Sequence, residues 1–310
     1  MHHLFCYDNS MKKDVVIIGA SILDVLCVPT SSDVFEVGSY PCDDVKLSLG
    51  GDALNEAILL SKMNKNVELV TLLGNDDAGR FIQNKCIENK ITLRNELKVG
   101  YKTGINVVLV KEDGSRHFLT NKNGTLRQLK LSDVCFPLSD AGILCFASIF
   151  VFPYFTDYEL STLFKQAKSQ NMTIVCDMTK RKNLETPEDL KECLKYIDYL
   201  IPNDEEILLF TGCKSVEEAC TLLLSYGVRY VIVKCGSKGC YVCNANGGYY
   251  VPTSVVECID TTGAGDSFVS GFICKLIENK SIDECVSFGN KCGSLCVQKV
   301  GATTWMDMVE

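Results

Sequence analysis

The sequence predicts an α/β protein with a parallel central sheet and a small second sheet attached to it. Three observations predict this class. From about residue 130 onward, short apolar segments typical of strands alternate with segments of helical periodicity. These strands are continuous apolar runs, as expected when helices cover both faces of a parallel sheet. Residues 20–48 and 99–121 instead form short alternating segments, as antiparallel strands do.

The amino-terminal half predicts strands and helices in a mixed order. Val15–Gly19 is a β-branched run that ends in glycine and predicts a buried strand. The elements expected next are a helix over 56–63, a strand over 67–73, a helix over 79–89 and a hairpin over 105–119. Asp113-Gly114 supplies the turn of this hairpin, because the dipeptide tolerates the positive φ angles of a tight turn.

The carboxyl-terminal half predicts a regular alternation. Strands are expected over 142–147, 173–176, 199–201 and 230–233, and helices over 158–169, 187–194, 204–210 and 216–226. Residues 230–242 have the pattern of a strand, a turn and a strand, and two helices, over about 264–278 and 283–299, close the chain.

The domain organisation follows from these elements. We expect one large domain over residues 13–310, preceded by a loose extension over residues 1–12. The antiparallel segments, about residues 20–48 and 99–121, cannot lie inside a parallel sheet. They should therefore project from it as a small sheet, here called the lid.

Composition and charge exclude several classes of protein. With 46% hydrophobic and 23% charged residues, the chain has the composition of a globular protein. A formal charge of −8 argues against a nucleic-acid partner, because such binding depends on Lys and Arg at phosphates. The longest apolar stretch, 142–155, is too short to span a membrane, and no apolar segment typical of a signal peptide precedes Lys12-Lys13. We therefore expect a cytoplasmic protein.

The 18 cysteines are the most unusual feature of the composition. A disulfide framework is not expected without a signal peptide. Cys235, Cys240 and Cys243 have a spacing that suggests a metal site, but Cys240 and Cys243 would face opposite sides of a strand. We expect reduced cysteines that pack as small hydrophobic residues.

The segment Asp260–Phe268 carries the strongest functional signal. Gly263, Ala264 and Gly265 come directly before a helix, and small residues there let a ligand approach the unpaired N–H groups of the first turn. The helix dipole adds positive potential, so the site suits a phosphate. Asp266 would compete with phosphate as a mere helix-start carboxylate, but it fits a general base that takes the proton of an attacking hydroxyl.

Polar residues near the first strand each have two interpretations. Asp24 follows that strand, where α/β folds bind ligands, although a turn aspartate would look the same. Asn55, after Gly50-Gly51, offers the donor and acceptor that a polyol needs, or it is only a helix-start amide.

Later polar residues are equally ambiguous. Asn203 and Glu206 by themselves look like a helix cap and a first-turn acid. We expect Lys234 to be a solvated charge rather than a nucleotide ligand, and Arg116 to be a surface charge of the lid. The sequence contains neither the P-loop pattern nor, at Gly19-Ala20-Ser21, the glycine pattern of a dinucleotide-binding fold.

Taken together, these motifs resemble the ribokinase, or PfkB, family of carbohydrate kinases. Asp260–Asp266 is similar to the carboxyl-terminal signature of that family and Gly50–Asn55 to its amino-terminal signature. Residues 73–79, 203–206, 234–239 and 301–302 match in order and spacing. The resemblance covers about residues 13–305. It implies a ribokinase-like three-layer α/β/α sandwich with a small β-sheet lid.

The resemblance also implies a reaction and residue roles. Such enzymes transfer the γ-phosphoryl group of ATP to a hydroxymethyl group of a sugar or nucleoside, with Mg²⁺. Asp266 would be the base, with Gly263, Ala264 and Gly265 as the anion hole. Substrate hydroxyls would be held by Asp24, Gly50, Gly51 and Asn55. The nucleotide would contact Asn203, Gly236, Gly239 and Asn290, and Glu206 would hold Mg²⁺ through water. Some members also bind a monovalent cation such as K⁺, for which Asp260 and Thr262 stand at matching positions, and a homodimer through the lid is expected.

Departures from the ribokinase subgroup bear on the substrate. Asp52-Ala53-Leu54 stands where that subgroup typically has Lys-Gly-Ala, and Ile22 stands where it has asparagine. The stretch 145–153 lacks the acidic residue that the subgroup uses near the sugar. A hexose such as fructose, a ketogluconate-type acid and a nucleoside therefore stay open. Phe150, Phe152 and Tyr154 could stack on a base, although an apolar run favours core packing. The alternatives to a sugar kinase are a nucleoside kinase of the same fold and a catalytically silent sugar-binding protein.

Overall fold

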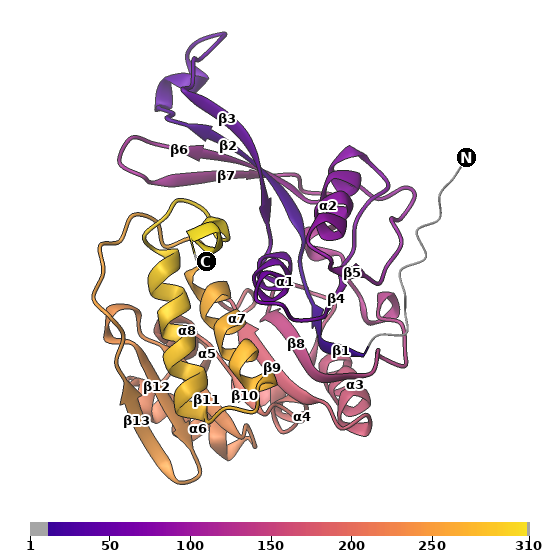
Figure 1. The fold of residues 1–310 in the computed structure, drawn as a ribbon, viewed down its shortest axis with the longest axis vertical. Coiled ribbons are helices and arrows are strands. Elements are labelled where there is room, and N and C mark those ends of the chain that lie inside the picture. The colour runs from indigo at the N-terminus through magenta and orange to yellow at the C-terminus, as the bar shows by residue number, and fades with distance from the viewer. Residues whose placement is uncertain (1–11, 309–310) are drawn as a thin grey trace.

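The computed structural model describes residues 12–308 and is built around a large mixed sheet (Figure 1). In this part of the chain the sheet has nine strands in the order β13-β12-β11-β10-β9-β8-β1-β4-β5. The strands are β1 (Lys13–Ile18), β4 (Val67–Val70), β5 (Thr92–Leu93), β8 (Ala141–Ile149), β9 (Thr173–Met178), β10 (Tyr199–Leu200), β11 (Tyr230–Lys234), β12 (Cys240–Asn244) and β13 (Gly247–Val251). Strands β11, β10, β9, β8, β1, β4 and β5 are parallel to one another, while β12 and β13 add an antiparallel edge.

Two layers of helices cover this sheet. Side chains of β1 alternate between them: Val16 and Ile18 belong to one core cluster, and Val15 and Ile17 to the other. The first cluster contains α3 (Asp157–Ser169), α4 (Lys191–Leu194), α5 (Asp204–Thr211) and α6 (Val216–Ser225). The second contains α1 (Asp52–Lys62), α2 (Asp77–Glu88), α7 (Ala264–Ile277) and α8 (Ile282–Cys296). The predicted three-layer sandwich is therefore confirmed.

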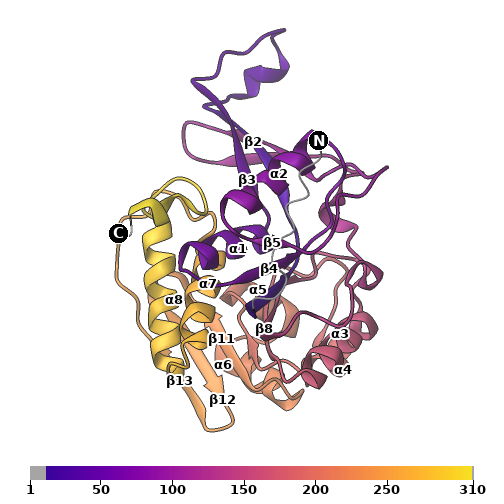
Figure 2. The same ribbon diagram turned by 45° about the vertical axis from the view of Figure 1, so that its right-hand side comes forward.

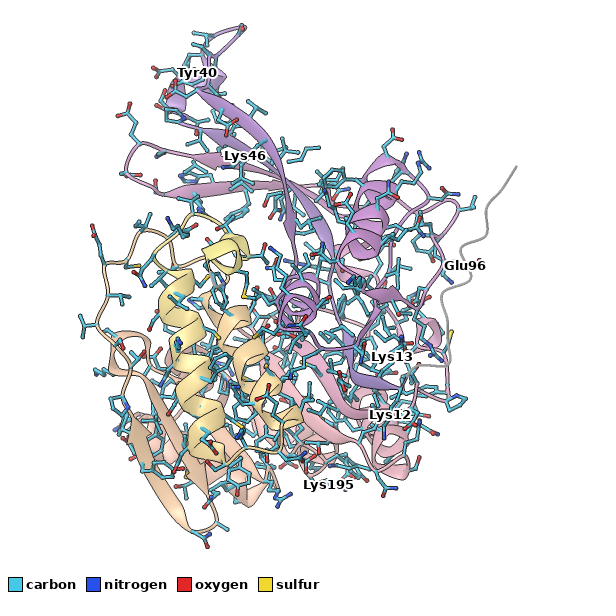
Figure 3. All side chains as sticks on the ribbon, in the orientation of Figure 1. Lys12, Lys13, Tyr40, Lys46, Glu96 and Lys195 are labelled. Carbon is cyan, nitrogen blue, oxygen red and sulfur yellow. The ribbon has the colours of Figure 1, made fainter. Side chains whose placement is uncertain are left out.

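The lid is a second sheet that projects from the first (Figure 2). Among the described residues its strand order is β3-β2-β6-β7. The strands are β2 (Ile22–Val28), β3 (Asp44–Gly50), β6 (Ile105–Val110) and β7 (Arg116–Thr120). The hairpin turn lies where the sequence predicts it, with Gly114 at φ +80°. The β2–β6 pair is parallel, which the expectation of purely antiparallel lid strands did not include. Tyr40 and Lys46 mark the lid in Figure 3, and Lys195 marks the opposite end of the molecule.

The two faces of the lid differ in character. Asp24, Ser48, Asn106 and Thr120 are paired across the four strands and form a polar row. The next row, on the opposite face, consists of Val25, Leu47, Val107 and Leu119. One face of the lid is therefore apolar, whereas the other carries a polar row next to a mixed row that consists of Leu26, Lys46, Val108 and Phe118.

A few elements differ from the sequence-based expectation. The helix expected over 187–194 is a 3₁₀ turn, Pro187–Leu190, followed by the short helix α4. Strand β13 has no counterpart among the expected strands, and neither has the two-residue β5. The loose extension expected over residues 1–12 lies outside the described residues except for Lys12.

The cysteines behave as small hydrophobic residues wherever the structure describes them. All of the described cysteines are free thiols, and most are buried. Cys240 and Cys243 belong to opposite core clusters, as their spacing predicts. Over residues 12–308, no helix is long and apolar enough to cross a bilayer.

Candidate functional site

The loop before α7 and the first turn of that helix form the centre of the site. Gly263 is the helix N-cap in a left-handed conformation, with φ +76°. A Cβ at Gly263 would lie 2.3 Å from the Cβ of Ala302, so only glycine fits. The N–H groups of the first turn lack partners within the helix and, with the helix dipole, favour an anion. The structure thus provides the helix-start geometry expected for Gly263, Ala264 and Gly265.

Asp266 lies in this first turn and is joined to α1. Its Oδ2 accepts a hydrogen bond of 2.7 Å from the Asn55 amide. Burial and the nearby Asp52 carboxylate raise the pKa of Asp266, although the Asn55 hydrogen bond opposes the shift. A carboxyl group with a raised pKa holds a proton more strongly than an ordinary aspartate, which suits a general base. The fold therefore joins two residues that lie 211 positions apart in the sequence.

A pocket of about 620 Å³ opens beside Asp266. It lies at the carboxyl ends of β9, β10 and β11, between α7 and the segment 253–258. In open α/β sheets this is the edge at which ligands bind. Eight residues that the sequence analysis assigns to the site line it: Asn203, Glu206, Gly236, Gly239, Ala264, Gly265, Asp266 and Asn290.

Asn203 and Glu206 are linked by a reciprocal cap at the start of α5. The Asn203 side chain accepts from the Glu206 N–H at 2.8 Å, and the Glu206 carboxylate accepts from the Asn203 N–H at 2.8 Å. Burial raises the pKa of Glu206 to about 7, against the opposing charge of Lys234. The helix-cap interpretation is correct, and the same two residues also line the pocket.

The prediction that Lys234 is a solvated charge is wrong. Its ammonium donates to both carboxylate oxygens of Asp177, at 2.8 and 2.7 Å, and 14% of its side chain is exposed. The sequence shows Lys234 at the end of an apolar strand, but it does not show that Asp177, at the end of β9, lies opposite. Both residues line the pocket.

The residues expected to bind substrate lie outside this pocket, at the base of the lid. Asp24 accepts a 3.0 Å hydrogen bond from Asn106, which in turn accepts one of 2.8 Å from Thr120. Burial raises the pKa of Asp24, opposed by the Asn106 hydrogen bond and the charge of Arg116. A Cβ on Gly50 would lie 2.3 Å from Asp24 Oδ2, so glycine keeps this carboxylate accessible. The structure thus brings Asp24 and Gly50 together.

Gly51 and Asn55 connect the lid base to the centre of the site. Gly51 has φ +93°, and a Cβ there would lie 2.5 Å from the Ala20 carbonyl oxygen, so the turn into α1 requires glycine. One turn later, Asn55 reaches Asp266 with its amide nitrogen. The amide oxygen of Asn55 is buried and has no hydrogen-bond partner in the structure. A buried acceptor of this kind points to a missing donor, such as a hydroxyl.

Arg116 corrects the expectation of a plain surface charge. Its guanidinium bridges from β7 of the lid to the loop before α7, where it donates to Asp260 at 2.6 Å and also to Thr262. Asp260 additionally accepts from the N–H groups of Gly301 at 2.9 Å and Thr262 at 3.0 Å. Burial would raise the pKa of Asp260, but these hydrogen bonds and Arg116 lower it. The two residues considered for a monovalent cation are therefore held by an arginine.

Asn290 and the aromatic residues of 150–154 have structural contacts. The Asn290 amide donates to the carbonyl oxygens of Val251 and Pro252, at 3.2 and 3.3 Å, and so holds the end of β13 against α8. Phe152 is buried in the core and Phe150 packs edge-on against Phe210, which supports core packing for both. Tyr154 is exposed beneath the Lys130 ammonium.

Sequence reasoning missed several residues of the site: Asp52, Asn106, Ser148 and Asp177. For Asp177 a signal existed, because it directly follows the apolar run 173–176 and therefore stands at the carboxyl end of a strand. Asp52 stands within the Gly50–Asn55 motif itself, and its carboxylate lines the pocket, where it accepts a hydrogen bond from the Ser148 hydroxyl.

Comparison with known proteins agrees with this architecture. The sequence model of the pfkB family carbohydrate kinases matches residues 12–308. The ribokinase of Staphylococcus aureus (strain COL) is 28% identical over 272 residues, which cover 84% of this chain and 86% of the relative. The ribokinase structure from Thermotoga maritima is 27% identical, with a TM-score of 0.78 over 94% of this chain and 95% of its own. The Arabidopsis thaliana ribokinase complexed with ribose and ATP, at 24% identity, also has a TM-score of 0.78, over 96% of each chain. The chain therefore belongs to the pfkB family of carbohydrate kinases, which are phosphotransferases.

Proposed function

We propose that the protein transfers the γ-phosphoryl group of ATP to a hydroxymethyl group of a sugar, with Mg²⁺. The observation that carries this proposal is the position of Asp266. It lies at a helix start suited to phosphate, bounds the 620 Å³ pocket, and is joined through Asn55 to the polar base of the lid. A base between an anion site and a hydroxyl site is what transfer to an alcohol requires.

The nucleotide would occupy the pocket. Backbone at Gly236 and Gly239 would lie along it, and a Cβ on Gly239 would meet the Val251 carbonyl oxygen at 2.2 Å, so the loop depends on glycine there. Arabidopsis ribokinase, whose structure contains ribose and ATP, supports ATP as the donor. The phosphates would point to Ala264 and Gly265 at the start of α7.

The donor set of the pocket fits Mg²⁺. No three acidic, His or Cys side chains among the described residues are close enough to form a cage around a metal ion. Carboxylates of Asp52 and Glu206 do line the pocket, and oxygen donors combined with water and phosphates are what Mg²⁺ prefers. Bound there, Mg²⁺ would neutralise charge on the phosphates. Glu206 would hold it through water.

In the proposed reaction Asp266 takes the proton of the substrate hydroxyl as its oxygen attacks the γ-phosphorus. The bond from that phosphorus to the bridging oxygen of ADP breaks. The N–H groups of Gly263, Ala264 and Gly265 stabilise the charge on the transferring group. Asp24 and Asn55 orient the sugar through its other hydroxyls.

A panel of acceptors tests the proposal. Ribose, fructose, a ketogluconate-type acid and nucleosides are each incubated with ATP and Mg²⁺, and ADP release is measured. We expect release with one of the sugars. Release with nucleosides alone would make the protein a nucleoside kinase of this fold. Ligand-induced stabilisation without release from any acceptor would favour a silent sugar-binding protein.

The monovalent cation and the dimer belong to the same proposal. Because Asp260 is held by Arg116, K⁺ would depend mainly on backbone carbonyl oxygens around Gly301. A comparison of rates in potassium and tetramethylammonium salts tests this site.

We also propose a homodimer in which the apolar face of the lid is covered by a second copy. Val45, Leu47 and Leu119 on this face are 62%, 54% and 54% exposed.

A further inference from the structure

Lys234 is held in one position by its surroundings. It ends β11, and its N–H donates to the Pro202 carbonyl oxygen at 2.9 Å. Its ammonium contacts both oxygens of Asp177, whose side chain is only 6% exposed. An ammonium has three N–H donors, and Asp177 takes two of them. The third is available to an acceptor in the pocket.

The ammonium lies against the proposed anion hole. A Cβ built on Gly265 would come within 3.3 Å of the Lys234 nitrogen. Gly265 therefore leaves room for a positive charge directly beside the first turn of α7. This turn also carries Asp266, the proposed base.

Acidic residues outnumber basic residues in the lining of the pocket, and this makes Lys234 important for binding an anion. Six of the lining residues are acidic: Asp52, Asp177, Asp204, Glu205, Glu206 and Asp266. Lys234 is the single lysine, arginine or histidine among the described residues that line it. A triphosphate entering such a pocket meets strong repulsion unless cations offset it. Apart from a metal ion, Lys234 is the group that can do so.

We propose that Lys234 is a catalytic residue of the proposed phosphoryl transfer, and that Asp177 is its positioning residue. The inference rests on the proposed function. Lys234 donates its third N–H to a non-bridging oxygen of the γ-phosphoryl group and stays protonated throughout. The bond changes are those given above, and the proton of the acceptor hydroxyl goes to Asp266. The fixed ammonium stabilises charge on the transferring group without reorganising at the moment of reaction.

The test separates this role from simple neutralisation of Asp177. Because Lys234→Met alone leaves a buried carboxylate unpaired and destabilises the fold, the decisive variant is Lys234→Met combined with Asp177→Asn, which removes both charges. Lys234→Arg tests partial rescue. Lys168→Met combined with Asp198→Asn, which removes another ion pair at the amino-terminal ends of β9 and β10, is the matched control.

The readouts are the melting temperature, the steady-state constants, and calorimetric binding of ADP and of a non-hydrolysable ATP analogue with Mg²⁺. In the double variant we expect a near-normal melting temperature, a kcat about 10²- to 10³-fold lower and a sugar KM within about twofold. Affinity for the ATP analogue should fall about tenfold more than affinity for ADP, because only the analogue carries a γ-phosphoryl group. Lys234→Arg should recover part of kcat, and the variant that combines Lys168→Met with Asp198→Asn should keep the kcat and the nucleotide affinities of the unaltered protein.

Recovery of kcat to near the normal value in the double variant would overturn the proposal, because Lys234 would then only neutralise Asp177. An equal loss of affinity for ADP and the analogue would overturn it as well. If the unaltered protein phosphorylated no sugar, the proposed function would fail. The binding comparison would still decide whether Lys234 contacts the γ-phosphoryl group.

Discussion

At the scale of single residues, Asp266 has the chemistry that the proposed reaction depends on most. It is the group within reach of both the anion hole and Asn55. We expect Asp266→Ala to lower kcat by roughly 10²- to 10⁴-fold, the contribution typical of a positioned general base. ATP affinity, measured by calorimetry, should change little, because the backbone N–H groups remain. Turnover close to that of the unaltered protein would rule out this base.

The pH dependence of kcat reports on the same carboxyl group. The pKa of Asp266 is raised by burial and by the charge of Asp52. The base works only when deprotonated, so kcat should fall on the acidic side, with a midpoint above the usual range of aspartate. Asp52→Asn removes a charge that raises this pKa, and the acidic limb should therefore move to lower pH. Profiles of kcat between pH 5 and 9 for the two proteins provide the check. An unmoved limb would mean that another group controls it.

Glu56 offers a prediction about stability. It is fully buried, accepts a 3.1 Å hydrogen bond from Cys145, and its other oxygen has no partner. Burial and the nearby charges of Asp266 and Asp177 raise its pKa well above the ordinary value. A carboxyl group whose pKa is raised on folding stabilises the protein at low pH, and this stabilisation is lost as pH rises toward the folded-state pKa.

Glu56→Gln removes that titration. The melting temperature of the variant relative to the unaltered protein should therefore rise between pH 5 and pH 8, because the glutamine never has to carry a buried charge. Differential scanning fluorimetry at the two pH values measures the difference. Glu112→Gln, on the exposed turn of the lid hairpin, is the control and should show no such trend. A difference that shrinks with rising pH would contradict the prediction.

At the scale of elements, the sequence predicted the strands whose residues are continuously apolar. Thr173–Met178 and Tyr230–Lys234 are buried in the middle of the sheet and were found by that pattern. Strand β13 is exposed over most of its length and begins with two glycines, so apolar periodicity does not mark it, although Tyr249, Tyr250 and Val251 favour a strand. Pro187 starts a 3₁₀ turn where a longer helix was expected.

The same distinction holds for the site. Asp266 and its glycines could be predicted because their chemistry is contained in one contiguous segment. The roles of Lys234 and Arg116 could not, because each depends on a partner 57 or 144 residues away that only the fold brings near. A lone charged residue in the sequence is most often solvated, and local reasoning retains that interpretation.

Arg116 links the lid strand β7 to the loop before α7 through its hydrogen bonds to Asp260 and Thr262. We expect Arg116→Met to accelerate amide hydrogen exchange in β7 and in residues 260–263, since both lose their shared contact. The sugar KM should rise about tenfold, as expected when a charge-assisted hydrogen bond holding the lid over the substrate is lost. Lys111→Met, at the exposed hairpin turn, should leave both unchanged. Unchanged exchange in both segments of Arg116→Met would show that the lid is held by other contacts.

At the scale of the whole molecule, the lid is a sheet that leaves an apolar face exposed. Its polar row faces the proposed substrate site, whereas Leu47 and Leu119 on the other side are exposed, although they are large apolar residues. Burying a leucine fully stabilises a protein or complex by about 1.5–3 kcal/mol. A second copy of the chain can offer an identical face, and a self-complementary interface between two copies is the commonest way to cover it.

The dimer proposal therefore predicts a specific response to charge. Leu47→Glu combined with Leu119→Glu places carboxylates in the middle of the proposed interface, where burial without partners is costly. The double variant should elute as a monomer in size-exclusion chromatography with light scattering, whereas the unaltered protein should have twice the chain mass. Lys46→Ala changes the neighbouring position, whose side chain points to the other face of the strand, and should leave the dimer intact. Equal masses for the unaltered protein and the double variant would contradict the proposal. If the lid also needs its partner for rigidity, the monomer will lose sugar affinity while its nucleotide affinity, which depends on the large sheet, is kept.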